Sequence, residues 1–278
     1  MKQDPRTIID EKQDSGLHRS ESIVQRKPDV KFPTFQWVKD KVDSRDYIYK
    51  PSAVKVVNKV DLRPYTNQVE DQGQLGSCTG NAIAEAIEML YNKNKKKVDL
   101  SRLFIYYYTR LIEGTVKYDS GAYIRNGIKA CNHYGAPLES LWPYNISKFR
   151  SAPSSVAVTD ASKRKITRYE RASNFDACID ALTNGYPVVV GFLVYSSFVS
   201  SSVTRTGIMP YPNTRSEKLL GGHAVLLVGF DNANQRFIVK NSWGTGWGDR
   251  GYFYMPYKVI QNTRMSDDFW VIKGVNIV

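Results

Sequence analysis

The spacing of apolar residues changes once along this chain, near residue 165, from the period of helices to that of strands. From Cys78 onward, apolar residues recur at helical intervals up to a lysine run that begins at Lys93. Two more helices are predicted over residues 101–114, capped by a serine, and 123–134, ended by Gly135. The apolar face of the first helix comprises Ala82, Ile83, Ala86, Ile87, Leu90 and Tyr91.

Beyond residue 165 the sequence predicts mainly strands, apart from one short helix over residues 174–184. The strand predictions rest on runs of β-branched and aromatic residues bounded by Gly, Asn and Asp turns. A helical half that precedes a β half, without an internal repeat, predicts an α+β fold. The predicted strands cover residues 188–194, 223–230, 236–240, 251–255 and 269–277.

Residues 1–50 are polar and mixed in charge, with little periodicity, and are expected to form an extension rather than a domain. Five aromatic residues lie near its end. A purely disordered tail rarely carries so many rings, so part of the extension is expected to pack on the body of the protein. The rings are those of Phe32, Phe35, Trp37, Tyr47 and Tyr49.

The formal net charge of +12 raises the question of nucleic acid or another acidic partner. The densest basic run, residues 93–97, falls at the predicted end of a helix, where cations complement the helix dipole. A solvated helix end is the favoured interpretation, with an acidic partner as the alternative. No RNA-recognition signature, zinc-finger spacing or phosphate-binding glycine loop accompanies the charge, so we expect no nucleic acid, metal or other cofactor.

No apolar run approaches the roughly 18 residues needed to span a membrane, and no export signal is visible. The three cysteines are too few and too scattered for a disulfide scaffold or a zinc knuckle. Cys131 and Cys178 fall in helical apolar stripes, and both are expected to be buried.

Cys78 differs from these two because a glycine-rich turn, residues 72–80, places it at the start of a helix. Free backbone N–H groups and the positive end of the helix dipole stabilise a thiolate at that position, and the thiolate is the nucleophile. The glycines allow a substrate backbone to come close. A cysteine at a helix start is by itself more often structural, so a catalytic assignment depends on partners.

Two further segments supply candidate partners. His223 enters an apolar strand through two glycines, a position that suits a general base but also a hydrogen-bonded core histidine. Asn241 follows a predicted strand and can accept a hydrogen bond from an imidazole without adding charge. Trp243 and Trp247 can shield that bond from water, although a turn with two core tryptophans would give the same pattern.

Together the three segments resemble the papain-like, cathepsin-type cysteine peptidases. In that family the histidine and asparagine follow the cysteine by about 130–150 residues; His223 lies within this interval and Asn241 slightly beyond it. The resemblance covers about residues 56–278 and includes shorter matches in the family's order. These are Asp61-Leu62-Arg63, Leu100-Ser101 with Phe104 and residues 106–108, Gly121 with Ile124 and Gly135, Trp142-Pro143-Tyr144, and Pro187-Val188-Val189.

The resemblance implies a papain-like two-lobed fold with the active-site cleft between the lobes. The peptidase domain would span residues 56–278, with a helical lobe at about 75–160. An antiparallel, barrel-like β lobe would cover about 165–278 and part of 56–74. Residues 1–55 would form the N-terminal extension, where family members commonly carry a propeptide. We hypothesise that this extension is autoinhibitory; a permanently packed surface extension is the alternative.

The resemblance also implies the chemistry. Cys78 would attack the scissile carbonyl as a thiolate, and His223 would protonate the leaving amine. Asn241 would orient His223, and Trp243 would cover the hydrogen bond between them.

Substrate contacts follow from the same resemblance. Gln72 matches the family's oxyanion-hole glutamine, which acts together with the backbone N–H of the nucleophile, whereas Gln74 fits that position less well. Gly121 would pair in extended fashion with the substrate backbone. Ala224 would line the second specificity pocket, and Trp243 completes the predicted substrate contacts.

Two positions depart from the family's pattern. Leu75 stands where a disulfide cysteine is usual, and Thr79 where a tryptophan is usual. The missing disulfide favours a reducing compartment, and in this respect the chain is similar to bacterial and viral members. We expect a monomer without membrane attachment that is intracellular or virion-associated rather than secreted.

The predicted function is therefore that of a cysteine endopeptidase acting on peptide or protein substrates. The alternative is a catalytically silent papain-like module that binds peptides or proteins. The presence of Gln72, Cys78, His223 and Asn241 together favours the enzyme. A transglutaminase-like acyl transferase also uses Cys and His, but the segment of residues 241–244, Asn-Ser-Trp-Gly, favours the peptidase.

Overall fold

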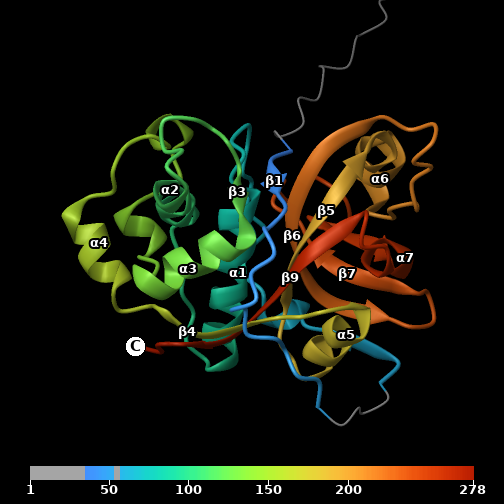
Figure 1. Ribbon diagram of the computed structural model, residues 1–278, viewed down its shortest axis with the longest axis horizontal. Helices are drawn as coiled ribbons and strands as arrows, with labels where there is room; N and C mark the ends of the chain where they lie inside the picture. The colour runs from blue at the N-terminus through green and yellow to red at the C-terminus, as the bar shows by residue number, and fades with distance from the viewer. Residues whose placement is uncertain (1–34, 53–56) are drawn as a thin grey trace, which may run out of the picture. The chain divides into compact units, whose positions relative to one another are not determined.

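The computed structural model describes residues 35–52 and 57–278. In this part of the chain, helices gather on one side and a large antiparallel sheet on the other, which gives two lobes (Figure 1). The helical lobe also carries the short 3-10 helices η2 (Glu139–Leu141) and η3 (Ile146–Lys148). Its α-helices are α1 (Cys78–Lys93), α2 (Arg102–Glu113), α3 (Ile124–His133) and α4 (Ser155–Ala161).

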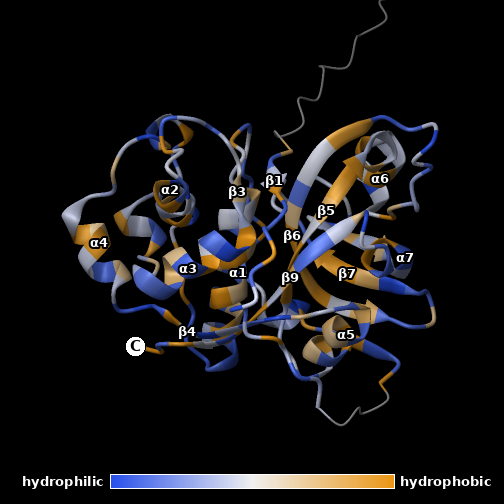
Figure 2. Ribbon diagram, in the orientation of Figure 1, coloured by the Kyte–Doolittle hydropathy of each residue, from blue (hydrophilic) through white to orange (hydrophobic). Residues whose placement is uncertain are grey.

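The second lobe is a seven-stranded sheet in the order β4-β9-β5-β6-β7-β8, with β2 paired to β6. All of its strand pairs are antiparallel. Strands β5, β6 and β7 are largely hydrophobic (Figure 2) and build the core of this lobe. The strands are β2 (Lys59–Asp61), β4 (Ile166–Arg171), β5 (Val188–Tyr195), β6 (Leu219–Asp231), β7 (Arg236–Lys240), β8 (Tyr252–Pro256) and β9 (Ser266–Val275).

Three short helices accompany the sheet (Figure 1). They are α5 (Phe175–Thr183), α6 (Ser201–Thr206) and α7 (Tyr257–Gln261), and the single turns η1 (Arg63–Tyr65) and η4 (Ser196–Val199) lie in the same half. Only α5 was predicted, because α6 and α7 are too short to show a helical period in the sequence.

These elements confirm the α+β, two-lobed prediction. The first helix begins at Cys78, as predicted, and its end at Lys93 places the lysine run at a helix C-terminus. The hydroxyl of Ser101 accepts a hydrogen bond from the backbone N–H of Phe104, so it is the N-cap of α2. Gly114 ends that helix with a φ of 71°, a left-handed conformation that glycine adopts without strain.

Some boundaries differ from the prediction. Strand β6 begins at Leu219 rather than at residue 223, and β9 begins at Ser266 rather than at residue 269. Strand β4, with the sequence Ile-Thr-Arg-Tyr-Glu-Arg, was not among the predicted strands. Its charged residues make it resemble a loop, and it becomes a strand because it pairs with β9 along one edge of the sheet.

Residues 35–52 belong to the same compact unit as the rest of the described chain. Strand β1 (Trp37–Val38) pairs in parallel with β3 (Ala122–Tyr123), which lies next to α3. Among the rings expected to pack on the body, those of Trp37 and Tyr49 are buried, whereas that of Tyr47 is 74% exposed. Phe35 is partly buried against the core, and Phe32 lies outside the described residues.

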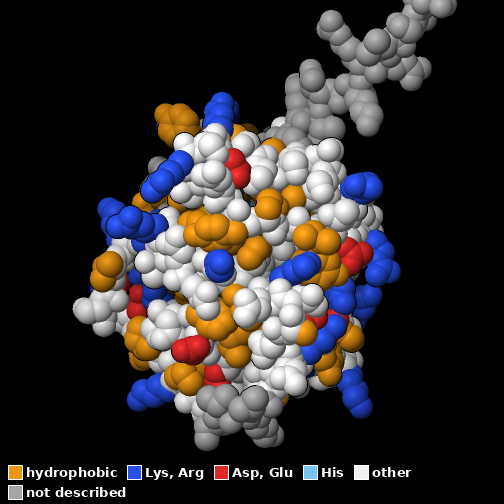
Figure 3. Space-filling view, turned by 90° about the vertical axis from the view of Figure 1, so that its right-hand side faces the viewer, with side chains coloured by type: hydrophobic (Ala, Val, Ile, Leu, Met, Phe, Trp, Pro, Cys, Tyr) orange, Lys and Arg blue, Asp and Glu red, His pale blue; other side chains and the backbone are white. Residues whose placement is uncertain are grey.

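Cys131 and Cys178 are fully buried, as predicted. Among the described residues, no helix combines the length and the apolar character that crossing a membrane requires. On the face that the sheet lobe presents (Figure 3), Lys and Arg side chains are dispersed among uncharged ones rather than gathered in one stripe.

A buried ion pair joins the two lobes. Lys240, the last residue of β7, donates from Nζ to a carboxylate oxygen of Glu85 in α1. The same ammonium donates to the backbone carbonyls of Asn67 at 2.8 Å and Gln68 at 3.1 Å. Burial raises the pKa of Glu85, and the charge of Lys240 opposes that rise. The lysine therefore compensates a carboxylate that the lobe interface has removed from water.

Replacing Lys240 with methionine should reduce the free energy of unfolding by about 3–5 kcal/mol, because Glu85 would remain buried without its partner. Urea denaturation followed by circular dichroism measures this difference. The double change of Lys240→Met with Glu85→Gln is the matched control and should recover most of the lost stability. A double variant as unstable as the single one would contradict the ion-pair explanation.

Candidate active site

Cys78 opens α1 and is fully buried. Burial raises the pKa of its thiol, and the backbone N–H groups of Ala224, Thr79 and Gln36 partly offset this effect. Ala224 is a residue of β6 that directly follows His223. The sulfur therefore lies where the start of α1 meets the strand that carries the histidine.

His223 is held by the asparagine that the sequence predicted. The oxygen Oδ1 of Asn241 lies 2.8 Å from Nε2 of His223 and also accepts from the backbone N–H of Ser242 at 2.9 Å. An acceptor at Nε2 selects the tautomer with its proton on that nitrogen, which leaves Nδ1 as the basic one. Burial lowers the pKa of His223 to about 4, while the hydrogen bond that the ring donates to Asn241 acts in the opposite direction.

Aromatic rings cover the imidazole, which is only 1% exposed. Trp243 is stacked on it with ring centroids 4.9 Å apart and planes 25° apart. Phe35 and Phe192 approach it at centroid distances of 6.2 and 5.9 Å. The bond between His223 and Asn241 therefore lies in a dry environment, where it is stronger than in water.

Gln72 links the turn before Cys78 to the segment after Asn241. Its backbone N–H donates to the carbonyl of Ser242 at 2.8 Å, and its Oε1 accepts from the hydroxyl of Ser242 at 2.7 Å. One N–H of its side-chain amide donates to the carbonyl of Leu75 at 2.9 Å. Sequence reasoning had assigned no role to Ser242, which anchors Gln72 at both its backbone and its side chain.

Sequence reasoning also missed a second set of hydrogen bonds that holds the site together. The carboxylate of Asp119 accepts hydrogen bonds from the backbone N–H of Gly76 at 3.1 Å and from the hydroxyl of Tyr106 at 2.5 Å. That hydroxyl in turn accepts from the backbone N–H of Gly121 at 3.2 Å. Asp119 and Tyr106 thus fix Gly76 and Gly121 relative to one another, and no local motif in the sequence marks either residue.

Residues 35–37 run along this site. The N–H of Gln36 faces the thiol of Cys78, and a Cβ added at Gly121 would lie 1.8 Å from the carbonyl oxygen of Gln36. Phe35 also packs edge-on against Trp243 at a centroid distance of 5.7 Å. The N-terminal segment therefore occupies the space in front of Cys78 and His223.

The structure thus brings the sequence-predicted residues to one place, at the junction of the two lobes. Gly121, with a φ of 68°, faces this place from the helical lobe. Ala224 faces it from the sheet lobe and pairs with Gly191 of β5. The complete predicted set is Gln72, Cys78, Gly121, His223, Ala224, Asn241 and Trp243. Within the described residues, no group of three or more His, Cys, Asp or Glu side chains is placed to hold a metal ion.

Comparison with known proteins gives a consistent result. The family model described as papain family cysteine protease matches residues 56–271. A peptidase C1-like protein of Acanthamoeba polyphaga mimivirus, itself described as uncharacterized, is 41% identical over 271 residues that cover 87% of each chain.

Solved structures show the same similarity. Xylellain, a cysteine protease from Xylella fastidiosa, is 40% identical, with a TM-score of 0.82 over 88% of this chain and 97% of that one. Digestive procathepsin L 3 of Tenebrio molitor larval midgut has a TM-score of 0.64 over 81% of this chain and 72% of that one. At 23% identity, the second similarity concerns the fold alone.

His223 should remain neutral in the full chain until the pH falls to about 4, compared with an ordinary value of 6.5. Since folding lowers its pKa, this residue should reduce the stability of the fold as the pH falls from about 6.5 to 4. Asn241→Ala should lower the midpoint further, because it removes the bond that favours the charged ring. Titration of ¹⁵N-labelled histidine side chains by NMR measures both midpoints.

Asn234→Ala, at an exposed turn, is the control and should leave the His223 midpoint unchanged. A midpoint near 6.5 in the unaltered chain, or the same midpoint in the Asn241→Ala variant, would show that burial and Asn241 do not act on the ring as described.

Proposed function

The chain belongs to the papain family of cysteine proteases, and we propose that it is an endopeptidase that residues 35–52 hold inactive until they are released. The observation that carries this proposal is the position of Gln36, whose backbone lies against both Cys78 and Gly121. A peptide substrate needs the same space.

In the released enzyme, Nδ1 of His223 accepts the proton of the Cys78 thiol. The thiolate attacks the scissile carbonyl carbon, and His223 transfers the proton to the nitrogen of the leaving amine, which departs and leaves a thioester on Cys78. Water then attacks this thioester while His223 accepts one of its protons. Release of the carboxylic acid returns that proton to the sulfur and restores the enzyme.

The neighbouring groups support each step. Asn241 accepts from Nε2 and so favours the charged imidazolium. The backbone N–H of Cys78, at the free start of α1, and the second N–H of the Gln72 side chain are the donors for the oxyanion. The links from Gln72 to Ser242 hold that side chain beside the nucleophile.

The segment of residues 35–37 is a poor substrate for its own site because of how its backbone is turned. Gln36 directs its N–H to the sulfur of Cys78 and its carbonyl oxygen to Gly121. Its bridge to Gly222 and the pairing of β1 with β3 are both parallel. The thiol therefore faces an N–H group rather than the face of a carbonyl carbon, and the bound segment blocks the site without being cut.

The docked segment also opposes the charge separation that catalysis needs. Burial raises the pKa of Cys78 and lowers that of His223, so both groups favour their neutral forms. Phe35 contributes to that burial through its contacts with His223 and Trp243. Release of the segment lets water reach Cys78 and His223. Water stabilises their charged forms, the thiolate and the imidazolium.

Cutting the chain behind the segment should activate the enzyme. We would insert a sequence for a site-specific protease between Ser52 and Val57 of the full chain, fold the protein, cut it and remove the freed segment by gel filtration. Hydrolysis of an internally quenched peptide, blocked at both ends, should rise at least about 100-fold, since docking worth about 2.7 kcal/mol leaves about 1% of molecules open.

The same protein with Cys78→Ala is the control and should remain inactive after cutting. Equal rates before and after cutting would refute autoinhibition. No cleavage of any peptide by the cut protein would refute the enzyme itself and favour the silent binding module. Cleavage of peptides with free ends only would refute endopeptidase action.

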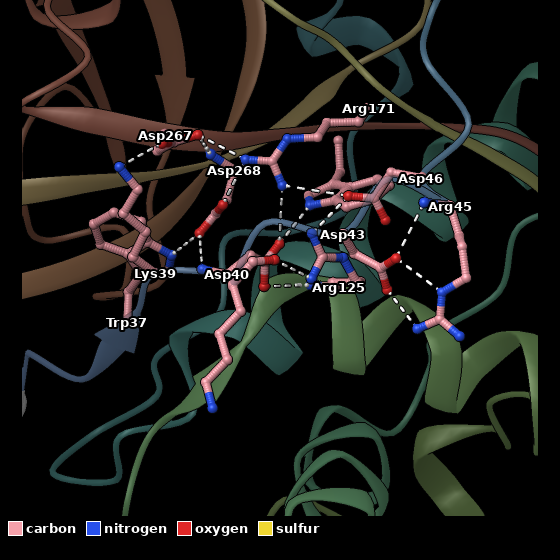
Figure 4. A network of polar contacts seen from close by, with 12 residues as sticks. Trp37, Lys39, Asp40, Asp43, Arg45, Asp46, Arg125, Arg171, Asp267 and Asp268 are labelled. Atoms are coloured by element: carbon pink, nitrogen blue, oxygen red, sulfur yellow. Dashed lines mark hydrogen bonds and ion pairs between the residues drawn. The ribbon is translucent and has the colours of Figure 1, made fainter.

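A charged network anchors the segment to the body of the protein (Figure 4). Asp40 is central to it: its backbone N–H donates to Asp268 at 2.7 Å, and its carboxylate accepts from the indole of Trp270 at 2.8 Å. Arg125 donates to Asp40 through its backbone N–H at 3.2 Å, and Arg171 lies 3.6 Å from the Asp40 carboxylate. The remaining charged members are Lys39, Asp43, Arg45 and Asp46 of the segment and Asp267 of β9.

The affinity with which this network holds the segment of residues 35–52 on the body of the protein should depend on pH. Burial and the neighbouring carboxylate of Asp268 raise the pKa of Asp40 from 3.8 to about 7, against the opposing effects of Trp270 and Arg125. A raised carboxyl pKa means that docking takes up a proton. Docking is therefore strongest below about pH 4, weakens by up to about tenfold per pH unit as the pH rises, and levels off above about pH 7.

The ratio of activity before cutting to activity after cutting, measured from pH 5 to 8, should therefore rise with pH. Asp40→Asn should flatten this rise. Asp43→Asn, which changes a carboxylate bound only to Arg45 in the network, should keep the rise. A slope that survives in Asp40→Asn, or inhibition that strengthens with pH, would contradict the assignment to Asp40.

A further inference from the structure

The side chain of Trp37 fills a pocket that two glycines of paired strands help to line. A Cβ added at Gly191 of β5 would lie 2.0 Å from Cε2 of the indole, and one added at Gly222 of β6 would lie 2.7 Å from Cε3. Any side chain at Gly191 would therefore enter the space of the ring. Trp37 is only 9% exposed, so the pocket fits a group as large as an indole and encloses it.

The end of this pocket carries a hydrogen-bond acceptor. Nε1 of Trp37 donates to Oδ2 of Asp268 at 3.1 Å, and the backbone N–H of Asp40 donates to the same oxygen at 2.7 Å (Figure 4). The other oxygen, Oδ1, accepts from Arg171 at 3.0 Å. Asp268 itself is fully buried. Both donors to Oδ2 belong to the segment, so release of the segment removes them together.

The pocket lies beside the nucleophile. Gly222 directly precedes His223, Gly191 pairs with Ala224, and Trp37 directly follows the residue that faces Cys78. Phe35, on the other side of that residue, contacts His223, the group that protonates the leaving amine. The pocket of Trp37 is therefore on the acyl side of the scissile bond, one residue before the residue whose carbonyl is attacked.

We propose that, in the released enzyme, this pocket selects substrates with tryptophan at the position immediately before the residue whose carbonyl is attacked, and that Asp268 accepts a hydrogen bond from the indole N–H. The inference rests on the proposed function and names its substrate class. An apolar side chain of similar size would leave Oδ2 of Asp268 without a partner, which is costly in a closed pocket. A positively charged substrate side chain would gain little binding energy in this pocket, because the guanidinium of Arg171 already offsets the charge of Asp268.

The test uses the full chain, cut behind the segment as above, with two fluorogenic dipeptides. One carries tryptophan before the scissile residue, and the other carries benzothienylalanine, which has the same shape but sulfur in place of the N–H. The value of kcat/KM should be at least about tenfold higher for tryptophan. In Asp268→Asn the ratio should fall to about 1, because Arg171 retains the amide oxygen and the NH₂ group then faces the indole N–H. Asparagine tolerates the φ of 58° at this position.

A size variant tests the walls separately. Gly191→Ala should reduce kcat/KM for the tryptophan peptide at least about tenfold and spare a peptide with valine at that position. Gly246→Ala is the matched control, since a Cβ there meets nothing within 4 Å, and it should change neither substrate.

Equal kcat/KM for the two dipeptides, or a ratio unchanged in Asp268→Asn, would overturn the inference while leaving the peptidase intact. Failure to cleave any peptide would instead overturn the proposed function. Even if no peptide is cleaved, binding of the same peptides to the cut Cys78→Ala protein, measured by calorimetry, tests whether the pocket prefers tryptophan. Tighter binding of the tryptophan peptide supports the inference, and equal binding overturns it.

Discussion

The packing of α1 against β6 is the contact on which the rest of the molecule depends. Helix α1 is buried along almost its whole length, from Cys78 to Tyr91, because the sheet lies on one side and α2 and α3 on the other (Figure 1). A helix enclosed in this way cannot shift without opening the core. Its first residue therefore has a fixed position against β6, and the thiol and the imidazole reach the same place from different lobes.

The same burial creates an electrostatic difficulty that the structure resolves in two ways. At the lobe interface, Lys240 compensates Glu85 with a permanent charge. At the candidate active site, no permanent counter-charge contacts His223 among its described partners; its hydrogen-bond partner is the neutral oxygen of Asn241. The first arrangement suits a structural contact. The second leaves the protonation of His223 adjustable, so the presence or absence of water in front of it decides which form prevails.

Much of this arrangement was predictable from the sequence because its signals are local. The glycine-rich turn, the serine cap of α2 and the apolar strand after His223 each act over a few neighbouring residues, and the structure follows them. The contributions of Ser242, Asp119 and Asp268 depend on contacts with residues distant in sequence, which no local pattern reveals. Strand β4 was missed for the same reason, since its pairing with β9 overrides its polar composition. The aromatic residues near the end of the extension were the one sequence signal that pointed to docking.

The covalent link between the docked segment and the body has its own consequence. A tethered strand meets its site at an effective concentration in the millimolar range when the connection is short, whatever the amount of protein present. Its occupancy is then the same in a crowded compartment and in a very dilute solution. One peptide-bond cleavage anywhere between Ser52 and the body would convert it into an ordinary ligand that dissociates on dilution. That cleavage, rather than any change in the folded core, would then make the occupancy of the site depend on the surroundings.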